Sequence, residues 1–312
     1  HTVTQTVHLI NPKSGWIQNC NSTPFTSAGA SSPNPKNYPS YMAPDGENGR
    51  GVNAVRLLSN GPKLSLDGLI GVGYNKYLSS FDLLLPPLFA AFDALPEGDA
   101  RKKEWAVYMS LLRNWSRHSG ASSVPTTWAI EWATKLNRQL PPPQTDIEAS
   151  HVWDRHQQLA TQVPPQKMLE LFGEVLQELQ QRWGTVPVPW GDVNRFQRHA
   201  QSINVFNDAS PSLPVGLASA AWGALPSYNS AYFSGTKKRY GFGGNSFVAA
   251  VEFGPRVKAK TVLAGGNSFN PASSNFTDQA ERYIEGQFKE ILFYKEDVLK
   301  AAVRSYHPGE EK

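Results

Sequence analysis

The 312-residue sequence has one cysteine, Cys20, so an intrachain disulfide is excluded. Charged residues make up only 18% of the chain. The formal net charge of +4 is too small to indicate a nucleic-acid partner. No apolar run reaches about 18 residues, the length that a membrane-spanning helix needs. Hydrophobic residues nevertheless make up 40%, which is typical of a folded protein with a substantial core.

Several sequence signatures of enzymes are also missing. His151, Asp154 and His156 lie close together, but their spacing matches no standard zinc set, and His-Glu-x-x-His is absent. The sequence lacks Gly-x-Ser-x-Gly and a Walker A loop, and Gly71-Val72-Gly73 lacks the third glycine of a dinucleotide-binding loop. A basic run at residues 237–239 fits a solvated loop better than an RNA-binding patch.

Hydrophobic periodicity divides the chain into three parts and predicts the α+β class. Residues 1–60 are expected to hold a strand at 2–10, followed by a long irregular segment at 22–51. A chain that begins within a strand suggests an upstream portion. Residues 61–185 are expected to be mainly helical. The first helix runs from about 65 to 81, and Pro86-Pro87 interrupts or ends it. Three further helices are expected at 103–115, 126–140 and 165–183. Residues 186–312 are expected to be β-rich, with a hairpin formed by 246–253 and 256–263.

The most informative stretch is residues 11–24, where a turn leads into a short extended run at 16–21. Alternation along a strand places Asn19 and Asn21 on one side and Cys20 on the other. Two neutral amides on one side can donate hydrogen bonds to an oxyanion. The alternative is a structural Asn in a turn before Pro24. Cys20 is interpreted as a small buried hydrophobic residue.

This stretch resembles the Gly-aromatic-x-x-Asn-x-Asn-x-x-Pro sequence of the penicillin amidase family of N-terminal-nucleophile hydrolases, nearest to its acyl-homoserine-lactone and aculeacin-type acylases. Residues 49–58 resemble the helix start that contains an Arg in that family. Residues 190–195 and 265–268 resemble further pieces, although Asn267 replaces the usual Gln. The resemblance extends over nearly the whole chain.

The resemblance implies a four-layer αββα sandwich with an inserted helical region. It implies that Asn21 donates to the oxyanion and that Arg50 holds this Asn or the substrate; an exposed Arg at a helix start is the alternative. Asn19 is a candidate substrate contact, or it satisfies neighbouring backbone groups. Trp16 and Phe25 are candidates to line an acyl pocket, or they belong to the ordinary core.

The resemblance also implies an N-terminal Ser nucleophile, which His1 does not supply. We therefore expect the chain to be the C-terminal part of a processed β chain, inactive alone, with an upstream β-chain segment and an α chain as partners. The implied substrate is a small acyl amide, an N-acyl-homoserine lactone; a broader acylase that also acts on β-lactam or lipopeptide amides is the close alternative. The chemistry needs no cofactor, although some relatives bind structural calcium, and the implied location is periplasmic or secreted. The alternative is a non-catalytic ligand-binding or scaffold protein of acylase architecture.

Overall fold

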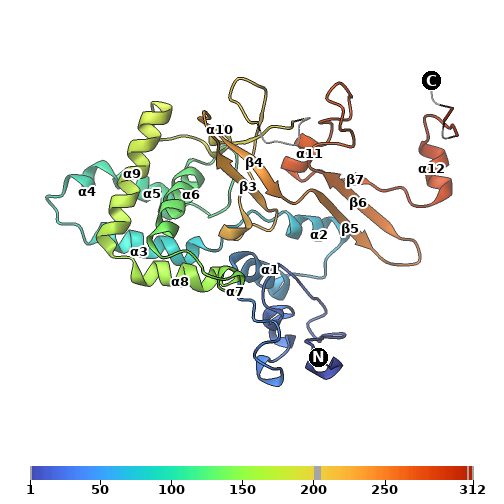
Figure 1. Ribbon diagram of the computed structural model, residues 1–312, viewed down its shortest axis with the longest axis horizontal. Coiled ribbons are helices and arrows are strands. Elements are labelled where there is room, and N and C mark those ends of the chain that lie inside the picture. The colour runs from blue at the N-terminus through green and yellow to red at the C-terminus, as the bar shows by residue number, and fades with distance from the viewer. Residues whose placement is uncertain (1, 200–204, 308, 311–312) are drawn as a thin grey trace. The chain divides into compact units, whose positions relative to one another are not determined.

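The structure is a computed structural model that describes residues 2–199, 205–307 and 309–310 (Figure 1). The chain forms two compact units. The first comprises His1–Lys63 and Val72–Gly244, and the second comprises Leu64–Gly71 and Asn245–Lys312. Helices and two sheets occur together, so the mixed α+β class predicted from the sequence is confirmed.

The first 48 residues contain short 3-10 turns joined by irregular chain. These turns are η1 (Val3–Gln5), η2 (Pro24–Thr26), η3 (Gly29–Ser31) and η4 (Pro35–Asn37). The strand expected at residues 2–10 is therefore wrong. The backbone N–H of Thr2 donates to the Gln5 side chain, which stabilises a turn, and Val3 and Ile10 are about four-fifths exposed. Because these apolar side chains meet no core, their alternation does not produce a strand.

Helices dominate the middle of the chain. They are α1 (Gly49–Asn60), α2 (Leu66–Gly73), α3 (Phe81–Asp93), α4 (Ala100–Glu104), α5 (Ala106–Asn114), α6 (Val124–Leu136), η5 (Asn137–Gln139), α7 (Asp146–Ser150), α8 (Val152–Gln162), α9 (Pro165–Trp183) and α10 (Trp190–Val193). The predicted end of α9 is confirmed, since Gly184 has a φ of 76° and caps the helix in the left-handed region. The short α7 and the helix α8 were not predicted.

The expected helix from about residue 65 to 81 is wrong in its second half. Helix α2 ends at Gly73, and a new helix, α3, begins at Phe81 and continues through Pro86 and Pro87. A proline inside a helix costs about 3 kcal/mol because it removes a backbone hydrogen bond and crowds the preceding turn. The buried face of α3, which includes Phe81, Leu84 and Leu88, offsets this cost at about 1.5–3 kcal/mol per side chain.

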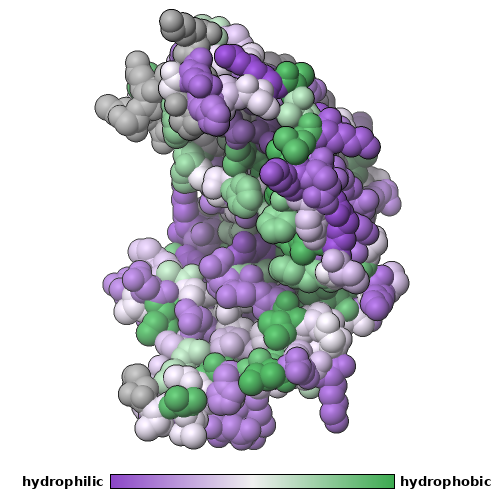
Figure 2. Space-filling model, turned by 90° about the vertical axis from the view of Figure 1, so that its right-hand side faces the viewer, coloured by the Kyte–Doolittle hydropathy of each residue, from purple (hydrophilic) through white to green (hydrophobic). Residues whose placement is uncertain are grey.

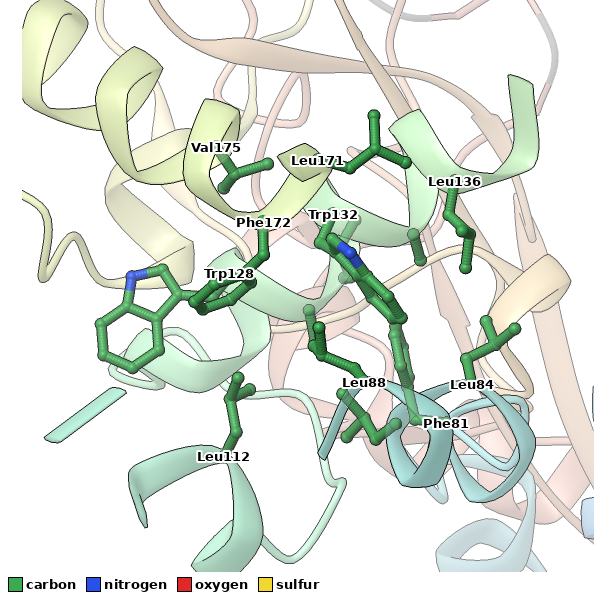
Figure 3. Close-up of a cluster of buried hydrophobic side chains, with 14 of the residues drawn as sticks. Phe81, Leu84, Leu88, Leu112, Trp128, Trp132, Leu136, Leu171, Phe172 and Val175 are labelled. Carbon is green, nitrogen blue, oxygen red and sulfur yellow. The ribbon is translucent and has the colours of Figure 1, made fainter. Parts of the chain in front are cut away.

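The core of the first unit lies between α3, α6 and α9 (Figure 3). Trp128 and Trp132 on α6 and Phe172 on α9 have no exposed surface. The Trp132 indole N–H donates to the Met168 carbonyl at 3.1 Å, so its polar atom is satisfied in the interior. This core packs the helices of the first unit against one another.

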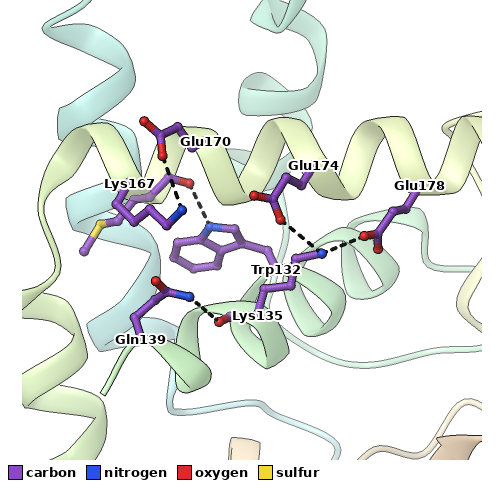
Figure 4. Close-up of polar contacts among 8 residues, drawn as sticks. Trp132, Lys135, Gln139, Lys167, Glu170, Glu174 and Glu178 are labelled. Carbon is purple, nitrogen blue, oxygen red and sulfur yellow. Dashed lines mark hydrogen bonds and ion pairs between the residues drawn. The ribbon is translucent and has the colours of Figure 1, made fainter. Parts of the chain in front are cut away.

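Ion pairs join α6 and α9 at the surface (Figure 4). Lys135 lies 2.7 Å from Glu178 and 3.2 Å from Glu174. Both carboxylates are about half exposed, so each pair contributes only about 0.2–1 kcal/mol. Apolar burial, not ion pairing, holds these two helices together.

A four-stranded sheet follows the helices in the first unit. Its strands are β1 (Asn194–Phe196), β2 (Leu213–Pro214), β3 (Tyr228–Tyr232) and β4 (Arg239–Gly244), with the short turn η6 (Ala220–Trp222) between β2 and β3. The order is β2-β1-β4-β3, and only the β1–β4 pair is parallel. Strands β1 and β2, with three and two residues, are too short to show a clear alternation in the sequence.

The second unit contains a three-stranded antiparallel sheet in the order β5-β6-β7. Its elements are β5 (Phe247–Glu252), β6 (Lys258–Leu263), α11 (Ala280–Glu285), β7 (Lys289–Glu290) and α12 (Lys295–Ala301). The predicted hairpin is confirmed, because Phe247 pairs with Leu263 and Glu252 with Lys258.

The surface mixes apolar and polar side chains, as one face of the molecule shows (Figure 2). The second unit exposes Phe253 and Phe269 almost completely. Within the described part of the chain, no helix has both the length and the apolar character that crossing a membrane requires.

A buried histidine in the first unit predicts a pH-dependent stability. His156 on α8 is stacked on Trp222, with ring centroids 5.4 Å apart. Burial, and to a smaller degree the Arg155 guanidinium, lowers the pKa of His156 to about 4. The unfolded chain therefore binds more protons than the folded one between pH 6.5 and 4. The neutral ring favours folding above this window, and we expect about 3 kcal/mol to be lost as the pH falls through it.

The measurement is urea unfolding of the protein at several pH values from 4 to 7. His156→Gln should flatten the dependence in that window, whereas His8→Gln, at an exposed histidine, should leave it unchanged. An equally steep dependence in His156→Gln would contradict this prediction.

Candidate active site

Residues 16–19 have no regular secondary structure and are not paired into either sheet, and a bend follows at Cys20 and Asn21, so the short strand expected at residues 16–21 does not form. The side chains of this segment nevertheless alternate as predicted. Asn19 and Asn21 are exposed, whereas Cys20 between them is buried, with 7% of its surface exposed. The backbone N–H of Gln18 donates to the Ser27 carbonyl at 2.8 Å and holds the segment against the loop that follows.

The two asparagines contact each other through the backbone. Asn21 has a φ of 52°, a left-handed conformation that Asn tolerates better than most residues. The Asn19 side-chain oxygen accepts a hydrogen bond from the Asn21 backbone N–H at 2.8 Å. Asn19 therefore stabilises the turn at Asn21, which was the alternative role considered for it. Its contact with substrate stays a prediction.

The start of α1 brings two more polar side chains to this segment. Asn48 is the N-cap residue, and its oxygen accepts from the Gly51 backbone N–H at 2.9 Å. Its amide nitrogen donates to the carbonyls of Cys20 at 3.0 Å and Asn21 at 3.3 Å. Arg50 Nη2 donates to the Cys20 carbonyl at 2.6 Å and to Asn21 Oδ1 at 2.5 Å. The structure thus places Asn21 and Arg50 in direct contact.

This contact fixes the orientation of the Asn21 carboxamide. A guanidinium can only donate hydrogen bonds, so the amide must turn its oxygen toward Arg50. The amide nitrogen then points away from Arg50, and it donates to no other residue in the described ranges. Its two N–H groups are left on an exposed side chain. The positive charge on Arg50 polarises the amide and makes those N–H groups better donors.

The thiol between the two asparagines is not placed to act as a nucleophile. Burial raises the pKa of Cys20; Arg50 opposes this effect and Glu47 adds to it. A thiol with a raised pKa stays protonated near neutral pH and is a poor nucleophile. The interpretation of Cys20 as a buried apolar residue therefore fits its surroundings.

The two aromatic candidates take part in the packing of the loop. The Trp16 indole lies so close to Gly29 that a methyl group there would be 3.1 Å from the ring. The Phe25 ring centroid is 6.1 Å from that of Tyr38. An open cavity of about 500 Å³ lies beside Trp16 and is lined by Asn11, Pro12, Gly15, Trp16 and Ile17. The roles of Trp16 and Phe25 in binding an acyl group stay predictions.

The sequence profile described as penicillin amidase matches residues 1–300. The chain belongs to the penicillin amidase family. Its fold resembles that of a thermostable penicillin G acylase from Alcaligenes faecalis, with a TM-score of 0.52 and 13% sequence identity. The match covers 95% of this chain and 57% of the acylase chain. This penicillin amidase chain therefore spans little more than half of the length of that relative.

Other pieces that resemble the penicillin amidase family have structural roles here. The Trp190 indole N–H donates to the Leu217 carbonyl, and the Asn194 amide donates to the carbonyls of Val215 and Leu217. In the second unit, the Gln279 amide donates to Asn267 Oδ1 at 3.4 Å. Asn267, which replaces the family's usual Gln, therefore takes part in the packing of its own loop.

The three residues weighed as metal ligands do not converge. His151 pairs with Asp154 at 2.9 Å and also contacts the Pro44 carbonyl, whereas His156 is stacked on Trp222. No group of three or more His, Cys, Asp and Glu side chains in the described part of the chain could hold a metal ion.

Sequence reasoning missed Asn48, the residue that joins α1 to the Asn21 segment. A signal was present, because an Asn directly before a helix start is a common N-cap. Its second role, donating to two carbonyls almost thirty residues away, has no local signature.

Proposed function

We propose that this chain belongs to an amide hydrolase in which Asn21 stabilises the oxyanion formed during acyl transfer. The observation that supports this role most directly is the orientation of the Asn21 carboxamide, whose oxygen is held by Arg50 so that its N–H groups are available to a ligand. Membership of the penicillin amidase family supports amidase activity.

In this proposal the nucleophile is the hydroxyl of an N-terminal Ser on an upstream β-chain segment, and an α chain completes the enzyme. The partial coverage of the penicillin G acylase is consistent with such partners. The Ser oxygen attacks the amide carbon, its proton passes to the Ser α-amino group, and the carbonyl electrons move to the oxygen. Asn21 donates to this oxyanion. As the C–N bond breaks, the ammonium proton passes to the leaving amine, and water then hydrolyses the acyl-enzyme.

The proposed substrate is an N-acyl-homoserine lactone, with β-lactam amides as close alternatives. The proposed location is the periplasm or the exterior of the cell. Turnover of lactones of several acyl lengths, measured beside penicillins, tests the substrate class. Intact mass and N-terminal sequencing test the nucleophile. A partner chain that begins with Ser is expected; one that begins with an inert residue would indicate a non-catalytic ligand-binding protein.

Replacement of Arg50 by Lys should lower kcat by about 10- to 100-fold, the effect of losing a charged hydrogen bond of about 1.5–3 kcal/mol. An ammonium group is a point charge and does not reproduce the guanidinium contacts with the Cys20 carbonyl and Asn21. The measurement is steady-state turnover of an acyl-homoserine lactone by the full enzyme.

Arg56 provides a matched control, because it lies on the same helix and contacts Asn53 and the Tyr77 ring instead of Asn21. Arg56→Lys should leave kcat unchanged. Equal kcat losses in the two variants would argue against a specific role for Arg50.

A further inference from the structure

The segment from Thr23 to Asn48 forms a closed loop that begins two residues after Asn21 and ends at the helix that bears Arg50. Its two ends are joined by the backbone N–H of Thr23, which donates to the Gly46 carbonyl at 2.9 Å. Glu47, a residue with no assigned role, lies at this junction.

Glu47 bonds to both ends of this loop. One carboxylate oxygen accepts from the Asn48 backbone N–H at 2.8 Å, and the other accepts from the Thr26 hydroxyl at 2.5 Å. Its carbonyl accepts from the Trp153 backbone N–H at 2.9 Å, which ties it to the start of α8. The partly buried carboxylate therefore connects Thr26 to the cap of α1, while the backbone carbonyl of Glu47 connects this junction to α8.

Glu47 also packs against the first turn of α1. A methyl group at Gly51 would collide with Glu47 Oε1, so the glycine makes room for the carboxylate. A negative charge at this end of the helix is favourable, because the helix N-terminus has a partial positive charge. Glu47 is thus held by charge, by hydrogen bonds and by shape.

We infer that Glu47 is a positioning residue for the Asn21 donor. Glu47 holds the Asn48 backbone, and the Asn48 amide in turn holds the carbonyls of Cys20 and Asn21. The same arrangement places Arg50, two residues further on, against Asn21 Oδ1. This inference rests on the proposed function of Asn21, and Glu47 itself makes no contact with the Asn21 side chain.

The test is a double-mutant cycle in the full enzyme, with kcat and KM measured on an acyl-homoserine lactone. Glu47→Ala should lower kcat by about 10- to 100-fold with a smaller change in KM. Glu47→Gln should restore most of the activity, because its amide can accept from Asn48 and donate to Thr26. Gly51→Ala, which displaces the carboxylate without removing it, should resemble Glu47→Ala.

In an Asn21→Ala background, Glu47→Ala should cost less than about twofold, since a residue that acts through Asn21 has nothing left to position. A merely structural role would lower the melting temperature and produce the same loss of kcat in both backgrounds, which would overturn the inference. Normal kcat in Glu47→Ala, with Asn21→Ala impaired, would overturn the inference alone. Normal turnover by Asn21→Ala would remove the proposed function and, with it, the positioning role.

Discussion

Replacement of Asn21 by Ala is expected to lower kcat of the full enzyme by about 100- to 1,000-fold, the usual cost of removing one oxyanion donor. The side chain is exposed and its amide N–H groups donate to no other described residue, so its loss should not disturb the core. If Asn21 has the proposed role, KM should change little, because the negative charge that its amide would stabilise develops only in the transition state.

A second variant separates donation from structure. Asn21→Asp keeps an oxygen that accepts from Arg50, but it replaces the N–H donors with an oxygen that repels an oxyanion. It should therefore be at least as impaired as Asn21→Ala, although the ion pair with Arg50 preserves the local fold. If the contact with Arg50 were the only role of Asn21, this variant would be active.

Asn34 supplies the control. It is an exposed Asn whose side-chain oxygen accepts from the Lys36 backbone N–H in a similar short turn. Asn34→Ala should leave kcat unchanged. The assay is steady-state turnover of a lactone substrate, with circular dichroism to show that each variant is folded. Near-normal kcat in Asn21→Ala or Asn21→Asp would remove Asn21 from the mechanism.

Local patterns predicted those parts of the fold in which the sequence and the tertiary environment agree. The helical spacing of its apolar residues predicted the buried face of α9, and Gly184 predicted its C-terminal end. The alternation of residues on either side of a turn predicted the β5–β6 hairpin. At residues 2–10 the alternation had no core to meet. At Pro86-Pro87 burial of the α3 face outweighed the unfavourable prolines. In both places the presence or absence of tertiary packing decided the structure, and a short stretch of sequence does not show that packing.

The candidate site divides in the same way. Asn21 and Arg50 were predicted as site residues because a family pattern surrounds each of them, and the structure brings their side chains into contact. Which way the carboxamide turns could not be predicted, since it depends on a donor 29 residues away. Asn48 and Glu47 were missed for the same reason. Their importance comes from contacts between segments, and each looks locally like an ordinary residue before a helix.

The helical core should be the most sensitive part of the chain to a change in stability. Trp132 is fully buried on α6 and belongs to the cluster formed with α3 and α9 (Figure 3). Trp132→Ala should lower the free energy of unfolding by about 3–5 kcal/mol, because it removes a large apolar side chain and leaves a cavity. The indole bond to the Met168 carbonyl is lost as well, which leaves a buried acceptor without its donor.

Urea unfolding followed by far-UV circular dichroism measures this effect. Trp132→Phe retains a ring and most of the packing, so its loss should be smaller, and the difference between the two variants separates volume from the indole hydrogen bond. Val303→Ala, at a fully exposed side chain, should change stability by less than about 0.5 kcal/mol. A loss below about 1 kcal/mol in Trp132→Ala would mean that α6 does not pack into the core as described. Trp132 makes none of the contacts that hold Asn21, so the folded fraction of Trp132→Ala should keep the wild-type kcat. The Trp132 and Asn21 variants therefore measure loss of stability and loss of catalysis at separate positions in the chain.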